Sequence, residues 1–247
     1  MTEQGRPSVG MAYLEVAAEL LGRLRDEEWA NIRAAAELVA DALAGGHAVH
    51  AFGSGHSHLL AEELYHRAGG LVAIKPILFE GLMLHASPAV STELERLPAV
   101  ADALLTDHPI AEGDVLIAAS NSGSNAVASR LAQLAREAGA RVIAVTSLRH
   151  STSSEARPNE LPRLHELADV VLDNGGAVGD AAIEIPGFDR RVAPTSTLIG
   201  AAILNAVVAE AVQLLVERGV PVEVYTSSNT QGGDEANAGF APAARPR

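Results

Sequence analysis

Residues 115–125 read VLIAASNSGSN, a short apolar run that changes without a break into a cluster of Ser, Asn and Gly. The run over Val115–Ala119 predicts a buried strand, and the polar cluster predicts the start of a helix that extends to about Glu137. An earlier stretch, residues 47–57 (HAVHAFGSGHS), repeats the arrangement with a Gly-rich loop after an apolar strand. Strands that alternate with helices in this way are typical of a parallel sheet with helices on both faces.

Five strands and two long helical segments are predicted along the chain. The strands are expected over residues 47–52, 71–75, 115–119, 141–145 and, for the fifth, either 170–172 or 182–185. Apolar residues at helical spacing predict a helical hairpin over residues 11–44 and a last helix over residues 196–217. The fold class is therefore predicted as α/β, with a five-stranded parallel sheet preceded by an N-terminal helical hairpin.

Three segments are predicted: an N-terminal helical extension over residues 1–45, an α/β domain over residues 46–220, and a C-terminal loop and tail over residues 221–247. Residues 148–160 (LRHSTSSEARPNE) are polar and rich in turn residues, which predicts a mobile flap or linker. Disorder is expected beyond Phe240, where no apolar period remains.

The composition restricts the class of function. The 247 residues include no cysteine, which removes disulfides and thiolate chemistry and fits a reducing compartment. A net charge of −13 and only 3% aromatic residues disfavour nucleic-acid binding, because an acidic surface repels phosphate backbones and few rings can stack on bases. No apolar run reaches the roughly 18 residues of a membrane span, and the start does not resemble a signal peptide. A cytoplasmic protein without membrane contact is expected.

The two strand-to-helix loops predict a phosphate site. The first loop contains Gly53, Ser54, Gly55, His56 and Ser57. The second contains Ser120, Asn121, Ser122, Gly123, Ser124 and Asn125. Glycines let the backbone approach an anion, and hydroxyls and unpaired N–H groups at a helix start can hold a phosphate without Lys or Arg. Either loop alone is also explained as a helix cap, but the second has far more capping residues than one cap needs.

With these residues the chain resembles the sugar isomerase (SIS) domain family, whose members pair a G-x-G-x-S loop with a later S-x-S-G-x-S/T loop that carries a phosphosugar's phosphate. Ser120, Ser122 and Gly123 match the second motif, whereas Asn125 stands where Ser or Thr is usual; the adjacent Ser124 is a candidate replacement. The resemblance covers about residues 35–217. It implies a flavodoxin-like three-layer fold, a phosphosugar ligand and a homodimer or homotetramer.

A third match is APTST at residues 193–197, which is similar to the A-P-T-S-x-T segment of the family's arabinose-phosphate isomerases. It adds Thr195, Ser196 and Thr197 to the predicted substrate site. Asn205 stands where those isomerases have an Asp, and a polar group among apolar residues needs a partner, so it is expected to contact ligand or a second subunit.

Residues 52–70 (FGSGHSHLLAEELYHRAGG) and 226–237 (TSSNTQGGDEAN) look like the bacterial SIS proteins that include an N-acetylglucosamine 6-phosphate dehydratase. This likeness implies abstraction of the C2 proton and loss of the C3 hydroxyl. An aldose–ketose isomerase for a heptose or pentose phosphate is the alternative enzyme, and a non-catalytic phosphosugar sensor is the alternative from another class.

Both enzymatic alternatives begin with removal of a proton next to a carbonyl, which needs a carboxylate or a His. Glu62 follows the first loop, and Glu184 ends the strand predicted at residues 182–185. These two and His56 are the candidate catalytic residues, with Glu184 slightly preferred. The nine His residues show no metal-ligand spacing, so neither a metal nor a cofactor is expected.

Overall fold

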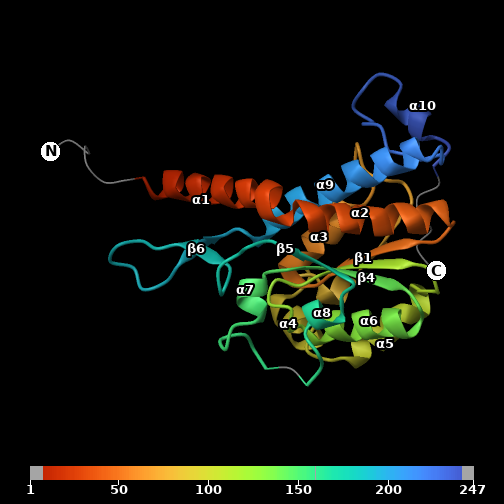
Figure 1. Ribbon diagram of the computed structural model, residues 1–247. Coiled ribbons are helices and arrows are strands. Elements are labelled where there is room, and N and C mark those ends of the chain that lie inside the picture. The colour runs from red at the N-terminus through yellow and green to blue at the C-terminus, as the bar shows by residue number, and fades with distance from the viewer. Residues whose placement is uncertain (1–7, 159, 241–247) are drawn as a thin grey trace.

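Five parallel strands form the central sheet, in the order β2-β1-β3-β4-β5 (Figure 1). The computed structural model describes residues 8–158 and 160–240. The strands are β1 (Val49–Gly53), β2 (Ile74–Ile77), β3 (Val115–Ala119), β4 (Arg141–Thr146) and β5 (Val170–Asp173). The predicted five-stranded parallel α/β fold is confirmed, and the first of the two alternatives for the fifth strand is the correct one.

Helices cover both faces of the sheet (Figure 1). One face carries α2 (Trp29–Ala44), α3 (His58–Glu63) and α9 (Ser196–Glu217), and the other carries α4 (Pro88–Leu94), α5 (Ala99–Asp107), α6 (Ala126–Glu137) and α8 (Leu164–Leu167). Side chains alternate along each strand. Ile117 and Ile143 therefore join the core under α2 and α9, whereas Leu116 and Val142 join the core under α5 and α6.

The N-terminal segment is one long helix rather than the predicted hairpin. It consists of α1 (Val9–Arg23), a π-helical turn η1 (Leu24–Glu28) and α2. No Pro lies between α1 and α2, so the chain continues as a helix and the π turn absorbs one extra residue. α1 projects beyond the sheet (Figure 1), whereas α2 buries Ile32, Ala36 and Val39 in the main core.

Residues 181–194 form a two-stranded antiparallel ribbon outside the main sheet. Its strands are β6 (Ala181–Ile183) and β7 (Val192–Pro194). Pro186 and Gly187 fall in the connection, which turns the chain back before a longer strand can form. The ribbon lies against α1, and the Tyr13 hydroxyl donates to the Pro194 carbonyl oxygen at 3.0 Å.

The C-terminal segment returns to the edge of the domain. Leu71 and Val224 form an antiparallel bridge, and the Gly69 N–H donates to the Tyr225 carbonyl oxygen at 2.8 Å. The short helix α10 (Gly233–Asn237) follows. The disorder predicted beyond Phe240 concerns residues 241–247, which lie outside the described residues. Residues 148–160, predicted to be a flap, begin with a short helix, α7 (Leu148–Ser151).

By length and composition alone, the last long helix, α9, could cross a membrane. The sequence alone did not identify it because polar residues interrupt its apolar runs. In this fold Ile199, Ile203 and Leu204 of α9 are buried in the core shared with α2. That packing is the arrangement of a core helix in a globular domain.

Candidate functional site

The sheet order reverses direction between β1 and β3, which is where ligands bind in doubly wound α/β folds. The two strands are adjacent, and Gly53 pairs in register with Ala119. The first loop therefore leaves the sheet beside the second loop, and both open helices on the same edge. This geometry brings together two segments that are distant in the sequence.

A glycine is required where the first loop begins. A Cβ atom on Gly53 would lie 2.2 Å from the Ser57 carbonyl oxygen, because the chain folds back immediately into a short 3-10 turn. Gly55 has φ +57°, a left-handed conformation that glycine adopts without strain. His56, which follows Gly55 and precedes α3, is exposed.

Gly53→Ala is expected to reduce the free energy of unfolding by about 1–3 kcal/mol, because the added methyl group overlaps backbone atoms that cannot move without displacing α3. Gly22→Ala is the matched control: a Cβ there meets nothing within 4 Å, and alanine in a helix is favoured by about 0.5–1 kcal/mol. Urea unfolding of both variants measures the two effects. Equal stability of Gly53→Ala and wild type would contradict this account of the loop.

Two residues predicted to bind substrate join the loops to each other. The Ser54 hydroxyl donates to Glu95 Oε2 at 3.1 Å and accepts from Asn125 Nδ2 at 2.9 Å. Asn125 also caps α6, because its Oδ1 accepts from the N–H groups of Val127 and Ala128. The departure from Ser or Thr at Asn125 therefore has a local explanation: the amide caps the helix and reaches across to the first loop.

The second loop carries three further hydroxyl side chains, those of Ser120, Ser122 and Ser124. The Ser124 hydroxyl donates to Ser122 Oγ at 3.1 Å, so Ser122 retains its own proton for another acceptor. Gly123 has φ +62°, and a Cβ there would lie 2.4 Å from Ser151 Oγ. Ser120 is 6% exposed and begins the turn by accepting the Gly123 N–H on its carbonyl oxygen.

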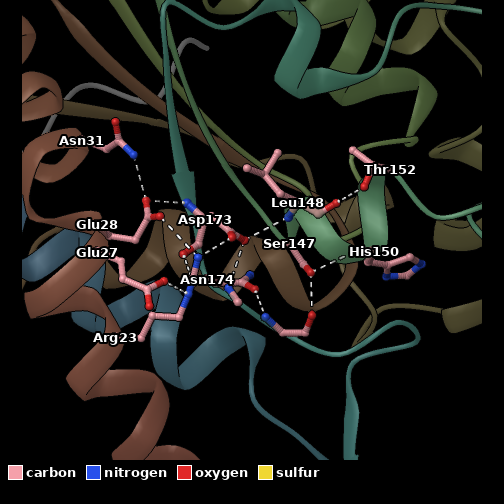
Figure 2. Close-up of polar contacts among 12 residues, drawn as sticks. Arg23, Glu27, Glu28, Asn31, Ser147, Leu148, His150, Thr152, Asp173 and Asn174 are labelled. Carbon is pink, nitrogen blue, oxygen red and sulfur yellow. Dashed lines mark hydrogen bonds and ion pairs between the residues drawn. The ribbon is translucent and has the colours of Figure 1, made fainter.

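A network of polar side chains surrounds the end of β5 (Figure 2), and Asn174 connects it to the second loop. Asn174 is 2% exposed, and its Nδ2 donates to Asn121 Oδ1 at 2.9 Å. The preceding residue, Asp173, accepts from Arg23 Nη2 at 2.8 Å and from the Leu148 N–H at 2.9 Å. The end of β5 therefore connects the loop to the N-terminal helix.

α3 and the first turns of α9 line two adjoining hollows, and the loops contribute Ser57 and Asn121 to the inner one. The inner one is small and is lined by Ser57, Leu60, Asn121, Val145, Asn174, Ser196 and Thr197. The outer one is an open cleft of about 380 Å³ lined by Leu59, Leu60, Glu62, Glu63, Arg67, Ala68, Thr197 and Ala201. The two share Leu60 and Thr197, so the outer cleft begins beside the inner hollow, and Ser120 and Ser122 line neither of them.

The start of α9 is already occupied by a carboxylate of the chain itself. Asp180 Oδ1 accepts from the N–H groups of Thr195 and Ser196, and the Ser196 hydroxyl donates to Asp180 Oδ2 at 2.5 Å. Thr195 is 1% exposed. Of the three residues predicted from APTST, Ser196 and Thr197 line the inner hollow, and the N–H groups of Thr195 and Ser196 are taken by Asp180. Sequence reasoning missed Asp180.

Among the two glutamates of α3, Glu62 retains the freer carboxylate. Its side chain is 48% exposed, and Oε1 lies 3.1 Å from Nε2 of the buried His58. Glu63 is paired with Arg67 and also accepts from Asn205 Nδ2 at 2.7 Å. Asn205, expected to contact ligand or a second subunit, is exposed and donates to Glu63 within the chain.

Glu184 does not lie where the sequence predicted. It follows β6 of the ribbon rather than the last strand of the sheet, its side chain is 73% exposed, and its carboxylate pairs with Arg191. It lines neither hollow. The prediction failed because a strand ending in Ile-Glu-Ile-Pro looks the same in a ribbon as in a sheet. Within the described residues, no group of three or more His, Asp and Glu is placed to hold a metal ion.

Comparison with known proteins defines the class. Residues 12–147 match the SIS domain family model, and the chain belongs to that family. It is 42% identical to a UPF0309 protein of Listeria innocua over 91% of each chain, and 42% identical to one of Geobacillus kaustophilus over 91% of this chain and 90% of that protein.

Solved structures share the fold at low sequence identity. A phosphoheptose isomerase from Francisella tularensis has a TM-score of 0.57 at 13% identity, covering 82% of this chain and 95% of that one. A phosphoheptose isomerase from Neisseria gonorrhoeae has a TM-score of 0.53 at 19% identity, covering 83% and 95%. The Vibrio vulnificus NanR protein complexed with ManNAc-6P has a TM-score of 0.50 at 18% identity, covering 86% and 64%.

Proposed function

We propose that this SIS protein is an enzyme that binds a phosphosugar and removes the proton at C2 of its open-chain form. The observation that carries the proposal is the pair of adjoining hollows, of which the inner one reaches Ser57 and Asn121 of the two loops and the outer one reaches Glu62. Phosphate at one end and a carboxylate at the other suit a substrate whose reacting carbon lies several bonds from its phosphate.

Each group has a part in this chemistry. The hydroxyls of Ser120 and Ser122 and the Asn121 amide hold the phosphate in the loop before α6, where hydroxyl and amide donors can hold an anion without Lys or Arg. Glu62 accepts the C2 proton. His58, buried beneath it, holds the Glu62 carboxylate by the 3.1 Å contact and limits its rotation. His56 is the reserve candidate for the base because it is exposed and precedes Ser57, which lines the inner hollow.

For the substrate we propose N-acetylglucosamine 6-phosphate, with dehydration as the overall reaction. After Glu62 takes the C2 proton, the electron pair left at C2 forms the C2–C3 double bond as the C3 hydroxyl leaves, protonated, as water. The likeness of residues 52–70 and 226–237 to a dehydratase subgroup supports this, and the complex of NanR with ManNAc-6P supports the phosphorylated N-acetylhexosamine as the class of ligand. The alternative is aldose–ketose isomerisation, in which the proton returns to C1; the phosphoheptose isomerases support it.

One experiment separates these reactions. The purified protein is incubated with N-acetylglucosamine 6-phosphate, a heptose phosphate and a pentose phosphate, and the products are followed by mass. Loss of one water indicates dehydration, and a new compound of unchanged mass indicates isomerisation. Binding without turnover of any of them would contradict an enzymatic role and favour a sensor.

We further propose that the working form is a homodimer or a larger homo-oligomer in the cytoplasm. The projecting helix α1 exposes Met11, Leu14 and Leu21, which suits a surface covered by a second copy. Light scattering at micromolar concentration is expected to give at least twice the monomer mass, and Leu14→Glu is expected to reduce it, whereas Glu15→Gln on the same helix is not. A wild-type monomer would contradict the proposal.

A further inference from the structure

The π turn between α1 and α2 places two charged side chains on one face. Residues five apart in an α-helix point about 140° away from each other, but the i→i+5 repeat of a π turn stacks them. Arg23 and Glu28 are such a pair, and Arg23 Nη2 lies 3.4 Å from Glu28 Oε1. Both side chains thereby reach the same end of β5 (Figure 2).

Arg23 and Glu28 hold Asp173 from two sides. Arg23 donates through Nη2 to Asp173 Oδ2 at 2.8 Å and through Nη1 to the Asp173 carbonyl oxygen at 3.3 Å. Glu28 Oε2 accepts the Asp173 N–H at 3.3 Å. Burial lowers the pKa of Arg23, but the carboxylates of Asp173 and Glu28 outweigh it and raise the pKa, so the guanidinium stays charged.

Removal of the Arg23 charge would leave two carboxylates facing each other with little access to water. Glu28 is 6% exposed and Asp173 is 7% exposed. Buried carboxylates without a counter-charge repel each other and gain little from solvent, so the end of β5 would have to shift to separate them.

The next residue transmits that position to the candidate phosphate loop. Asn174 donates to Asn121 Oδ1, which turns the amide oxygen of Asn121 toward Asn174 and leaves its NH₂ group to donate elsewhere. Both residues line the inner hollow. A shift of Asp173 moves Asn174, and the Asn121 amide then loses the contact that fixes its orientation.

We propose that Arg23 is a positioning residue of the phosphosugar site: from the N-terminal helix it fixes Asp173 and Asn174, and through them the amide of Asn121 that faces the phosphate. This rests on the proposed function, since it assumes that the second loop binds phosphate. Arg23 does not line either hollow, so its effect is exerted through the loop and not by contact with the ligand.

The test is binding of N-acetylglucosamine 6-phosphate and of inorganic phosphate, measured by calorimetry on the full chain. Arg23→Met is expected to weaken both about tenfold, and Arg23→Lys, which keeps the charge, is expected to recover part of the loss. The control is Arg25→Met, which removes the same charge two residues away from an exposed pair with Asp26. It is expected to bind as wild type does.

A local readout separates positioning from general destabilisation. Hydrogen exchange in a peptide covering residues 119–125 is expected to accelerate in Arg23→Met, while exchange in β1 stays as in wild type. Arg23→Met and Asn174→Ala combined are expected to weaken binding by less than the product of the two single effects, because both act through Asn121.

Wild-type affinity and wild-type loop exchange in Arg23→Met would overturn the inference while leaving the proposed function intact. If Arg23→Met does not fold, Arg23→Gln takes its place under the same criteria, and unchanged binding in it overturns the inference equally. Failure of the wild type to bind either probe would instead overturn the proposed function, and this inference with it.

Discussion

Glu62→Gln is expected to slow exchange of the substrate C2 proton with deuterated water by about 10²–10⁴-fold, the usual cost of losing a general base. The amide keeps the size of the side chain and a hydrogen-bonding group for His58, so the cleft keeps its shape. Phosphosugar binding is expected to stay within a few-fold of wild type, because the loops that hold the phosphate are untouched. Exchange reports proton abstraction whether elimination or isomerisation follows.

Two matched controls accompany this variant. Glu63→Gln changes the neighbouring carboxylate, which points about 100° away on the helix and is already paired with Arg67 and Asn205. Glu184→Gln changes the exposed carboxylate of the ribbon, which sequence reasoning had preferred. Both are expected to retain exchange. Wild-type exchange in Glu62→Gln would mean that the base is another residue, and His56→Gln would be the next variant to test.

The sequence predicted best those elements whose structure follows from a local residue pattern. β3 and α9 have the predicted bounds, since a short apolar run and a long helical period each have a single compatible structure. β2 was placed too early, at residues 71–75, because Leu71 is buried for another reason: it pairs with Val224 at the far end of the chain. Pro76, which argues against a central strand, is tolerated because β2 is an edge strand.

The candidate site was predictable as two loops but not as a set of contacts. Spacing located Ser120–Asn125, yet nothing local shows that Asn125 reaches Ser54 or that Asp180 caps α9. His58 was passed over because an alternating His-Ser-His run does not show which imidazole is buried. The contact of Arg23 with Asp173 depends on the π turn between α1 and α2, and no residue pattern in this part of the sequence predicts such a turn. These misses share one cause, which is pairing between segments that are distant in sequence.

Replacement of both Ser120 and Ser122 by Ala is expected to weaken binding of a phosphosugar at least about a hundredfold. A hydrogen bond to a charged group contributes roughly 1.5–3 kcal/mol, and each tenfold in affinity corresponds to about 1.4 kcal/mol, so two such bonds exceed that threshold. Ser122 suits the part because it accepts from Ser124 and keeps its own proton to donate.

Ser129→Ala is the matched control for the double variant. Ser129 lies on α6, the helix that the second loop opens, is fully buried, and has a hydroxyl without a partner among the described residues. Ser129→Ala also removes a serine hydroxyl, but it leaves the second loop unchanged, so wild-type binding is expected.

Calorimetry with N-acetylglucosamine 6-phosphate and its unphosphorylated counterpart adds a second criterion. The double variant should lose the preference for the phosphorylated sugar, because only the phosphate contacts are removed. A folded double variant that kept both affinity and preference would place the phosphate elsewhere, and the start of α9 would then have to release Asp180 to accept it.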